Sequence, residues 1–219
     1  MNLDWGVLWE YRRPRLAGAA TPIELTVLTM VGAIILGMML ALMRVGPVPV
    51  LRWIATAFTE FFRATPLLLQ VYWAFYVLPT LTGIALSPFA TGLIGLIVNV
   101  GAYNAETFRA GILSIRQGQR NAGLAIGMTR LQVMRHIVLP QAIRRVTPAL
   151  ASTWVSLFKD TSLVSVIAVT DLSYAALQVR SETYRVLEVL TGMAALYWLM
   201  GYPQAKLVDW IYRKYRTVE

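Results

Sequence analysis

An apolar stretch runs from Leu25 to Met43 and is interrupted only by threonines and glycines. A helix of about 20 mostly apolar residues is needed to cross the hydrocarbon core of a bilayer. Only 14% of the 219 residues are charged, against about 25% in an ordinary soluble domain. A soluble protein of this size could not bury so much apolar surface. The sequence therefore predicts an all-α, polytopic membrane protein.

Four further stretches have the length and apolarity of membrane spans, so we expect about five transmembrane helices. Asn99, Asn104 and Glu106 interrupt the third span, and Lys159 and Asp160 interrupt the fourth. The expected spans are about 23–44, 66–86, 88–108, 146–169 and 186–211. A long loop is left between the third and fourth spans.

Lys and Arg concentrate in loops on the cytoplasmic side of membrane proteins. One side of the expected topology holds Arg44, Arg52, Arg63, Arg109, Arg116, Arg120, Arg130, Arg135, Arg144, Arg145, Lys206, Arg213, Lys214 and Arg216. The other side holds only Arg12, Arg13, Arg15, Arg180 and Arg185. We therefore expect an extracytoplasmic segment 1–20 and a cytoplasmic tail 213–219. Asp4 and Glu10 help to exclude a secretory signal in the first segment.

Several classes of function are disfavoured. Cysteine is absent, which excludes disulfides and thiolate metal sites, and His136 has no candidate metal ligand nearby in the sequence. No G-x-x-x-x-G-K-[ST] phosphate loop occurs, nor does any Ser-His-Asp or paired-carboxylate pattern. The net charge of +9 arises between apolar stretches, unlike the basic face of a nucleic-acid-binding protein. We expect a non-catalytic protein with no metal, no cofactor and no nucleic-acid partner.

The segment from Arg109 to Thr147 contains seven arginines and no acid. Gln117–Ile126 is expected to be a short helix that ends at Gly127 in a left-handed cap. Thr129 and Gln132 form a capping-box pattern that opens a second short helix, which we expect Pro140 to end. Two interpretations are open: a hairpin lying on anionic lipid, or a docking element for a cytoplasmic partner.

Four motifs resemble those of ABC importer permeases, and three of them resemble the polar amino acid branch of that family. "GLAIGMTRLQVMRHIVLPQAIRRVTPAL", from Gly123, resembles the cytoplasmic loop of these permeases, in which Ala122, Gly127, Ile137, Leu139 and Pro140 fit the family frame. The other three are "EFFRATPLLLQVYW" from Glu60, "GAYNAETFRAGI" from Gly101 and "LFKDTSLVSVIAV" from Leu157. The resemblance covers nearly the whole chain and implies a type I ABC importer fold over 21–212.

This resemblance implies that loop 115–140 contains a coupling helix, which docks into an ABC ATP-binding subunit. The residues expected to couple the two subunits are Asn121, Ala122, Gly123, Gly127, Met128, Ile137, Leu139 and Pro140. The family's Glu-Ala-Ala is here Asn121-Ala122-Gly123, so the first position can form a hydrogen bond but not an ion pair.

The resemblance also implies a set of partners and a location. They are a second permease subunit, identical or homologous, and an extracytoplasmic solute-binding protein that delivers a polar amino acid or similar zwitterion. ATP and Mg²⁺ would bind to the ATPase partner, and the chain would lie in a bacterial inner membrane. The alternatives are a channel or scaffold that needs no nucleotide, or a lipid-modifying membrane enzyme.

Polar residues at bilayer depth are costly and therefore mark candidate sites. Asn99, Tyr103 and Glu106 share one helix face, and Glu106 is expected to pair with Arg109. On the fourth span, Ser152, Ser156 and Lys159 share a face, and Asp160 lies about 100° further round. These residues are candidates for a translocation path or gate; for Asn99 and Tyr103 the alternative is hydrogen bonding between helices.

Overall fold

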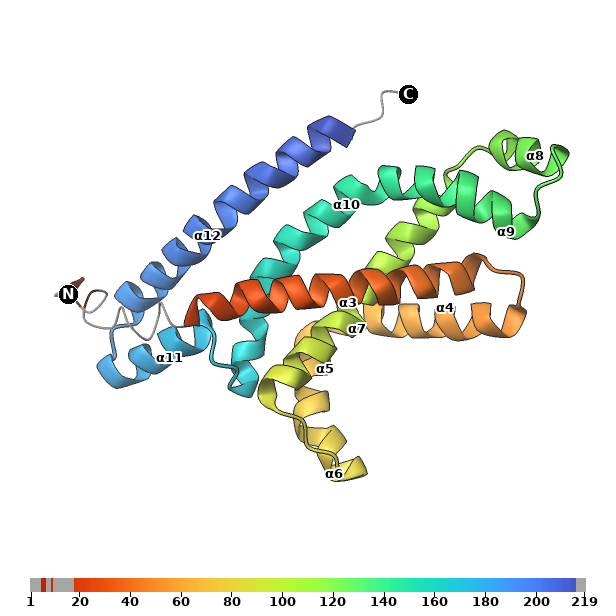
Figure 1. Ribbon diagram of the computed structural model, residues 1–219. Coiled ribbons are helices and arrows are strands. Elements are labelled where there is room, and N and C mark those ends of the chain that lie inside the picture. The colour runs from red at the N-terminus through yellow and green to blue at the C-terminus, as the bar shows by residue number, and fades with distance from the viewer. Residues whose placement is uncertain (1–4, 7–8, 10–17, 216–219) are drawn as a thin grey trace.

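The computed structural model describes Trp5, Gly6, Trp9 and residues 18–215, and the regular elements of this part are all helices (Figure 1). Most of the expected extracytoplasmic segment 1–20, with Arg12, Arg13 and Arg15, lies outside the described residues, as does Arg216. The elements are α3 (Ala20–Val45), α4 (Pro49–Ala64), α5 (Leu67–Tyr72), η1 (Trp73–Val77), α6 (Leu78–Thr82), α7 (Pro88–Leu113), α8 (Gln117–Ala125), α9 (Arg130–Val133), η2 (Met134–Val138), α10 (Leu139–Asp160), η3 (Thr161–Ile167), α11 (Leu172–Thr183) and α12 (Val186–Tyr215).

The centre of the fold is the crossing of α3 and α7 (Figure 1). Small residues allow the two backbones to approach closely, as is common between membrane helices. A Cβ atom added to Gly37 would lie 2.7 Å from Cβ of Asn104 and 3.0 Å from the backbone nitrogen of Ala105. Leu25, Met30, Leu96, Val100 and Leu157 are buried in one cluster around this crossing.

An amphipathic helix that the sequence analysis did not predict, α4, precedes the expected second span, and the chain bends sharply between the two. α4 lies beside α3 and α7, and the helix Leu67–Thr82 then leaves at 104° to it. Thr65 and Pro66 are extended at the break, because proline disfavours a helical conformation in the residue before it. The helix after the break ends at Gly83 (φ 71°), shortly before the expected end of the second span near residue 86.

The prediction that Pro140 ends the second short helix of the cytoplasmic loop was wrong. One helical path runs from Arg130 to Ile167, so α10 starts before the expected bound of 146. Proline lacks an N–H and clashes with the carbonyl four residues earlier in an α-helix. The π-helical turn η2, which is wider than an α-helical turn, comes just before Pro140. At its end the amide of Leu139 bonds to the carbonyl of Met134, five residues earlier. The same arrangement occurs before Pro79, where the amide of Leu78 bonds to the carbonyl of Trp73.

The helices differ in how well they meet the requirements of a membrane span. By length and composition, α3 alone qualifies within the described part of the chain. Two bent pairs also qualify if each counts as one span: α4 with Leu67–Thr82, and Arg130–Ile167 with α11, at 49°. α7 and α12 have 26 and 30 residues, which corresponds to about 39 and 45 Å. The five expected spans and their bounds remain predictions.

Candidate functional site

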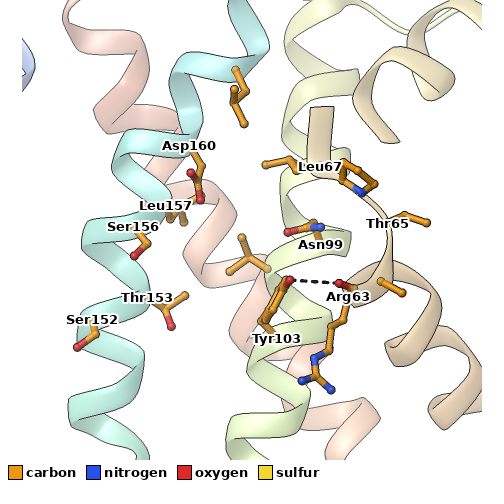
Figure 2. Close-up of a pocket in the computed structure, with 14 residues that line it drawn as sticks. Arg63, Thr65, Leu67, Asn99, Tyr103, Ser152, Thr153, Ser156, Leu157 and Asp160 are labelled. Atoms are coloured by element: carbon orange, nitrogen blue, oxygen red, sulfur yellow. Dashed lines mark hydrogen bonds between the residues drawn. The ribbon is translucent and has the colours of Figure 1, made fainter. Parts of the chain in front are cut away.

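A cavity of about 670 Å³ lies at the break between α4 and α5, and α7 and α10 form its other walls (Figure 2). Five of the candidate path residues line it: Asn99, Tyr103, Ser152, Ser156 and Asp160. The sequence analysis missed Arg63, Thr65 and Thr153, which also line it. The Arg-Ala-Thr-Pro sequence at 63–66 was a signal for this break, since a proline follows three residues that could otherwise extend the helix.

Polar side chains of α7 satisfy the last carbonyls of α4. Asn99 donates from Nδ2 to the carbonyl of Phe62 over 3.2 Å, and the hydroxyl of Tyr103 donates to the carbonyl of Arg63 over 3.2 Å (Figure 2). Gln70 donates to the same Phe62 carbonyl over 2.9 Å. Since helix ends leave carbonyls unpaired, these bonds stabilise the broken span. The hydrogen-bonding alternative for Asn99 and Tyr103 therefore agrees with the geometry, and both also line the cavity.

The wall formed by α10 carries hydroxyl groups and one carboxylate. Ser152, Ser156 and Asp160 lie along the face of α10 that borders the cavity (Figure 2). No ion pair within the part of the chain that the structure describes involves Asp160. Its carboxylate is therefore available to a cationic group in the cavity. Lys159 is exposed and does not line the cavity, so it is not brought together with Ser152 and Ser156.

Glu106 lies outside the cavity lining, in an ionic cluster that joins three helices. The expected pair with Arg109 is present, with Nε of Arg109 lying 3.1 Å from Oε2 of Glu106. Arg44 of α3 and Arg63 of α4 also approach Glu106, at 2.7 and 3.9 Å. Glu60 lies 3.5 Å from Arg63 and 3.8 Å from Arg44. The cluster links α3, α4 and α7 next to the cavity.

The expected coupling loop has the predicted local structure up to Gln132. Gly127 has a φ of 84°, as a left-handed cap requires. Both hydrogen bonds of the capping box at Thr129 and Gln132 are present. Gly123 is buried. A Cβ atom added there would lie 2.6 Å from Cδ1 of Ile137 and 2.9 Å from Cγ2 of Val133. α8 therefore packs closely on η2.

The remaining residues of the expected coupling set lie at or near the surface. Asn121 is exposed and accepts a hydrogen bond from Gln117 over 3.1 Å. Ala122 and Pro140 are also exposed, whereas Met128 and Leu139 are half-buried. Beside them, Ile126 and Leu131 are 79% and 77% exposed. The loop therefore exposes two large apolar side chains.

Two arginines, Arg120 and Arg145, donate hydrogen bonds to backbone carbonyls at the end of α7. Arg120 of α8 donates from Nη2 to the carbonyl of Ile112 over 2.6 Å, and Arg145 of α10 donates from Nη1 to the carbonyl of Ser114 over 2.9 Å. A cationic side chain at a helix C-terminus satisfies free carbonyls and is favoured by the helix dipole. A displacement of α8 would therefore reach α7, which lines the cavity.

The sequence and the fold were compared with those of known proteins. Residues 33–217 match the family described as "Binding-protein-dependent transport system inner membrane component". The chain is 32% identical over 198 residues to the glutamine transport system permease protein GlnP of Escherichia coli, covering 90% of each chain. It is 36% identical over 200 residues to the L-cystine transport system permease protein TcyB of Bacillus subtilis, covering 90% of this chain and 85% of that one.

Solved structures agree with this assignment. A chain from the crystal structure of an amino acid ABC transporter with histidines has a TM-score of 0.90 and 31% identity, with 98% of this chain and 100% of that chain covered. A chain of the MetNI methionine ABC transporter in an inward-facing conformation has a TM-score of 0.78, with the same coverage, and at 18% identity it supports the fold alone. The chain therefore belongs to the family of binding-protein-dependent transport system inner membrane components, as a permease of the amino acid ABC transporter type.

Proposed function

We propose that this chain is the translocation subunit of an ATP-driven importer, and that it carries a polar amino acid or a similar small zwitterion through the cavity at the α4–α5 break. The observation that carries the proposal is the carboxylate of Asp160, which forms no ion pair within the described residues, in a cavity otherwise lined by Arg63 and by hydroxyl, amide and apolar groups. A volume of about 670 Å³ lies within the range of small-molecule pockets. The relatives named for glutamine and L-cystine transport support the substrate class.

The two ends of an amino acid need different partners in such a cavity. Asp160 would accept hydrogen bonds from the ammonium group. The carboxylate would lie at the start of the helix Leu67–Thr82, whose first N–H groups have no acceptor within the helix. Leu67, at this start, and Pro66, just before it, border the cavity. Discontinuous helices bind zwitterionic substrates in this way in other transporters. Ser156 and Thr65 would supply hydroxyl groups between the two ends.

Energy for transport would come from a partner, because the sequence contains no phosphate loop. An ABC ATP-binding subunit would dock on the loop 115–140, with Ile126 and Leu131 in its contact surface. Its motion would pass through the packed pair of Gly123 and Ile137 to α10, and through Arg120 to α7. Both helices line the cavity, so the motion would alter access to the substrate.

The remaining parts of the transporter follow from the same proposal. A second permease subunit, identical or homologous, would complete the path. An extracytoplasmic binding protein would deliver the substrate on the side of residues 1–20. The carboxyl terminus and the loop 115–140 would face the cytoplasm of a bacterium, as the distribution of arginines predicts.

The proposal is tested by reconstituting the chain in liposomes with an ABC ATP-binding subunit and a solute-binding protein of the same cell. We expect uptake of a labelled polar amino acid that requires ATP, together with ATP hydrolysis that the substrate-loaded binding protein stimulates. The matched control omits only the binding protein. Uptake that proceeds equally well without ATP would favour the nucleotide-independent channel instead.

A further inference from the structure

A second cavity, of about 850 Å³, lies between the corner that joins α3 to α4 and the loop formed by α8 and α9. Figure 1 shows these segments at the same end of the molecule. Arg52, Arg120 and Arg130 border the cavity, together with apolar side chains that include Leu42, Val45 and Val138. The proposed translocation path does not use this cavity, and the two cavities share no residues.

The positive charge of this cavity is not balanced by the described part of the chain. No Asp or Glu lines the cavity, and no ion pair among the described residues involves its three arginines. Arg52 donates to the carbonyl of Gly46 over 2.9 Å, and Arg120 donates from Nη2 to Ile112. The Nε atom of Arg120 is buried without a hydrogen-bond partner. Since each guanidinium offers five N–H donors, most of these donors remain available to an anion.

The surroundings of the arginines indicate that the anion has apolar chains attached. Arg52 lies in the first turn of α4, and its neighbours Val50 and Trp53 are 65% and 73% exposed. Exposed tryptophans are enriched where membrane proteins meet the headgroup region. The cavity is itself walled by aliphatic residues of α3 and η2. A phosphate between the arginines would therefore leave acyl chains to lie against apolar surface.

We propose that this cavity binds an anionic phospholipid of the cytoplasmic leaflet, with the phosphate held by Arg52, Arg120 and Arg130. Arginine suits the role because its planar fork matches phosphate oxygens. Basic pockets on the cytoplasmic side of membrane proteins recognise such headgroups. Arg120 also holds the carbonyl of Ile112, so a bound lipid stabilises the position of α8 relative to α7.

The test measures lipid binding to the full-length chain in a mild detergent by native mass spectrometry, with phosphatidylglycerol and phosphatidylcholine as probes. The wild-type chain is expected to bind phosphatidylglycerol more tightly. Each arginine is expected to contribute about fivefold, so the double variant Arg52→Gln/Arg130→Gln should lower the affinity roughly 25-fold. Arg52→Lys/Arg130→Lys keeps the charges but not the planar fork, and should lower the affinity less than the double glutamine variant does. Arg144→Gln removes an exposed arginine outside the cavity and should have no effect.

Photoactivatable phosphatidylglycerol provides a measurement on the unmodified chain, and should label residues near Val45 and Met134. Equal affinity for the two lipids, or an equal loss in Arg144→Gln, would overturn the proposal. So would displacement of the lipid by millimolar inorganic phosphate, since that result assigns the arginines to a free anion. If the double variant keeps its lipid but releases the ATPase subunit from the assembled transporter, the cavity belongs to that partner instead. None of these binding measurements requires transport activity, so they do not depend on the proposed function.

Discussion

Arg44 donates a hydrogen bond from Nη1 to Oε2 of Glu106 over 2.7 Å, and this bond ties the end of α3 to α7. The side chain of Arg44 is only 10% exposed and that of Glu106 is 27% exposed. Arg63 and Arg109 approach the same carboxylate. Glu106 therefore approaches arginines from three helices, and its removal would leave Glu60 as the remaining acid of the cluster.

Glu106→Gln is expected to destabilise the protein by about 2 kcal/mol, because the amide keeps the shape of the side chain but not its charge. For a chain of this size, the change corresponds to a loss of roughly 4–8 °C in the unfolding temperature. The measurement is thermal unfolding of the detergent-solubilised chain.

Glu60→Gln is the matched control for that prediction. The side chain of Glu60 is 60% exposed, and its ion pairs measure 3.5 and 3.8 Å. Exposed pairs contribute less than about 1 kcal/mol, so the unfolding temperature should fall by a few degrees at most. Equal effects of the two variants would show that Glu106 is not the centre of the cluster.

Gly37→Ala tests the crossing of α3 and α7. The added Cβ atom would lie 3.0 Å from both the carbonyl oxygen of Gly101 and the backbone nitrogen of Ala105. Backbone atoms of a packed helix cannot move aside, and overpacking costs about 1–3 kcal/mol. We expect a lower unfolding temperature and a lower yield of folded protein. At Gly201 of α12 the nearest atom would be 3.7 Å away, so Gly201→Ala should be tolerated.

Asp160→Asn tests the cavity. A hydrogen bond to a charged group contributes about 1.5–3 kcal/mol, so the rate of uptake at limiting substrate should fall at least about tenfold. Association with the ATPase should be unchanged, because Asp160 is the last residue of α10, whereas the loop of α8 and α9 precedes the first. Lys159→Gln is the control, since that neighbouring side chain is exposed outside the cavity. If both variants transport normally, the substrate does not use this cavity.

Much of the fold and of the coupling loop could be predicted from local sequence. The left-handed cap at Gly127 and the capping box at Thr129 depend on residues no more than a few positions apart, and both are present. Glu106 and Arg109, which form the predicted pair, are likewise only about one helical turn apart in the sequence. The alternating arginine-rich and apolar segments predicted an all-α membrane protein, which agrees with the helical fold and with the amino acid permeases that it matches.

Features that depend on contacts between distant segments could not be predicted. The path from Leu67 leaves α4 at a sharp angle, and the break is stabilised by Asn99 and Tyr103, more than 30 positions away. Pro140 was a misleading signal, because a π-helical turn can accommodate a proline without ending the helix. Lys159 shared a helix face with Ser156 in the ideal pattern, but of the two only Ser156 lines the cavity.

The coupling role of the α8–α9 loop is tested at its left-handed residue. Gly127 has a φ of 84°, and an added Cβ atom would meet nothing within 4 Å, so a substitution there acts through the backbone alone. A left-handed conformation costs a residue other than glycine about 1–2 kcal/mol. Gly127→Ala should therefore loosen the bend between α8 and α9 without disturbing the core. Gly127→Val should do so more strongly, because a β-branched residue resists this conformation.

The expected result is a lower number of amino acid molecules imported per ATP hydrolysed, measured in the same proteoliposomes for both quantities. Gly118→Ala is the matched control, because Gly118 also has open space around it but lies within α8 without a positive φ. Alanine favours a helix more than glycine does, so that variant should keep the ratio of the wild type. A wild-type ratio in Gly127→Val would mean that the bend does not transmit the motion of the ATPase, because the two glycines differ in backbone conformation and not in the space around them.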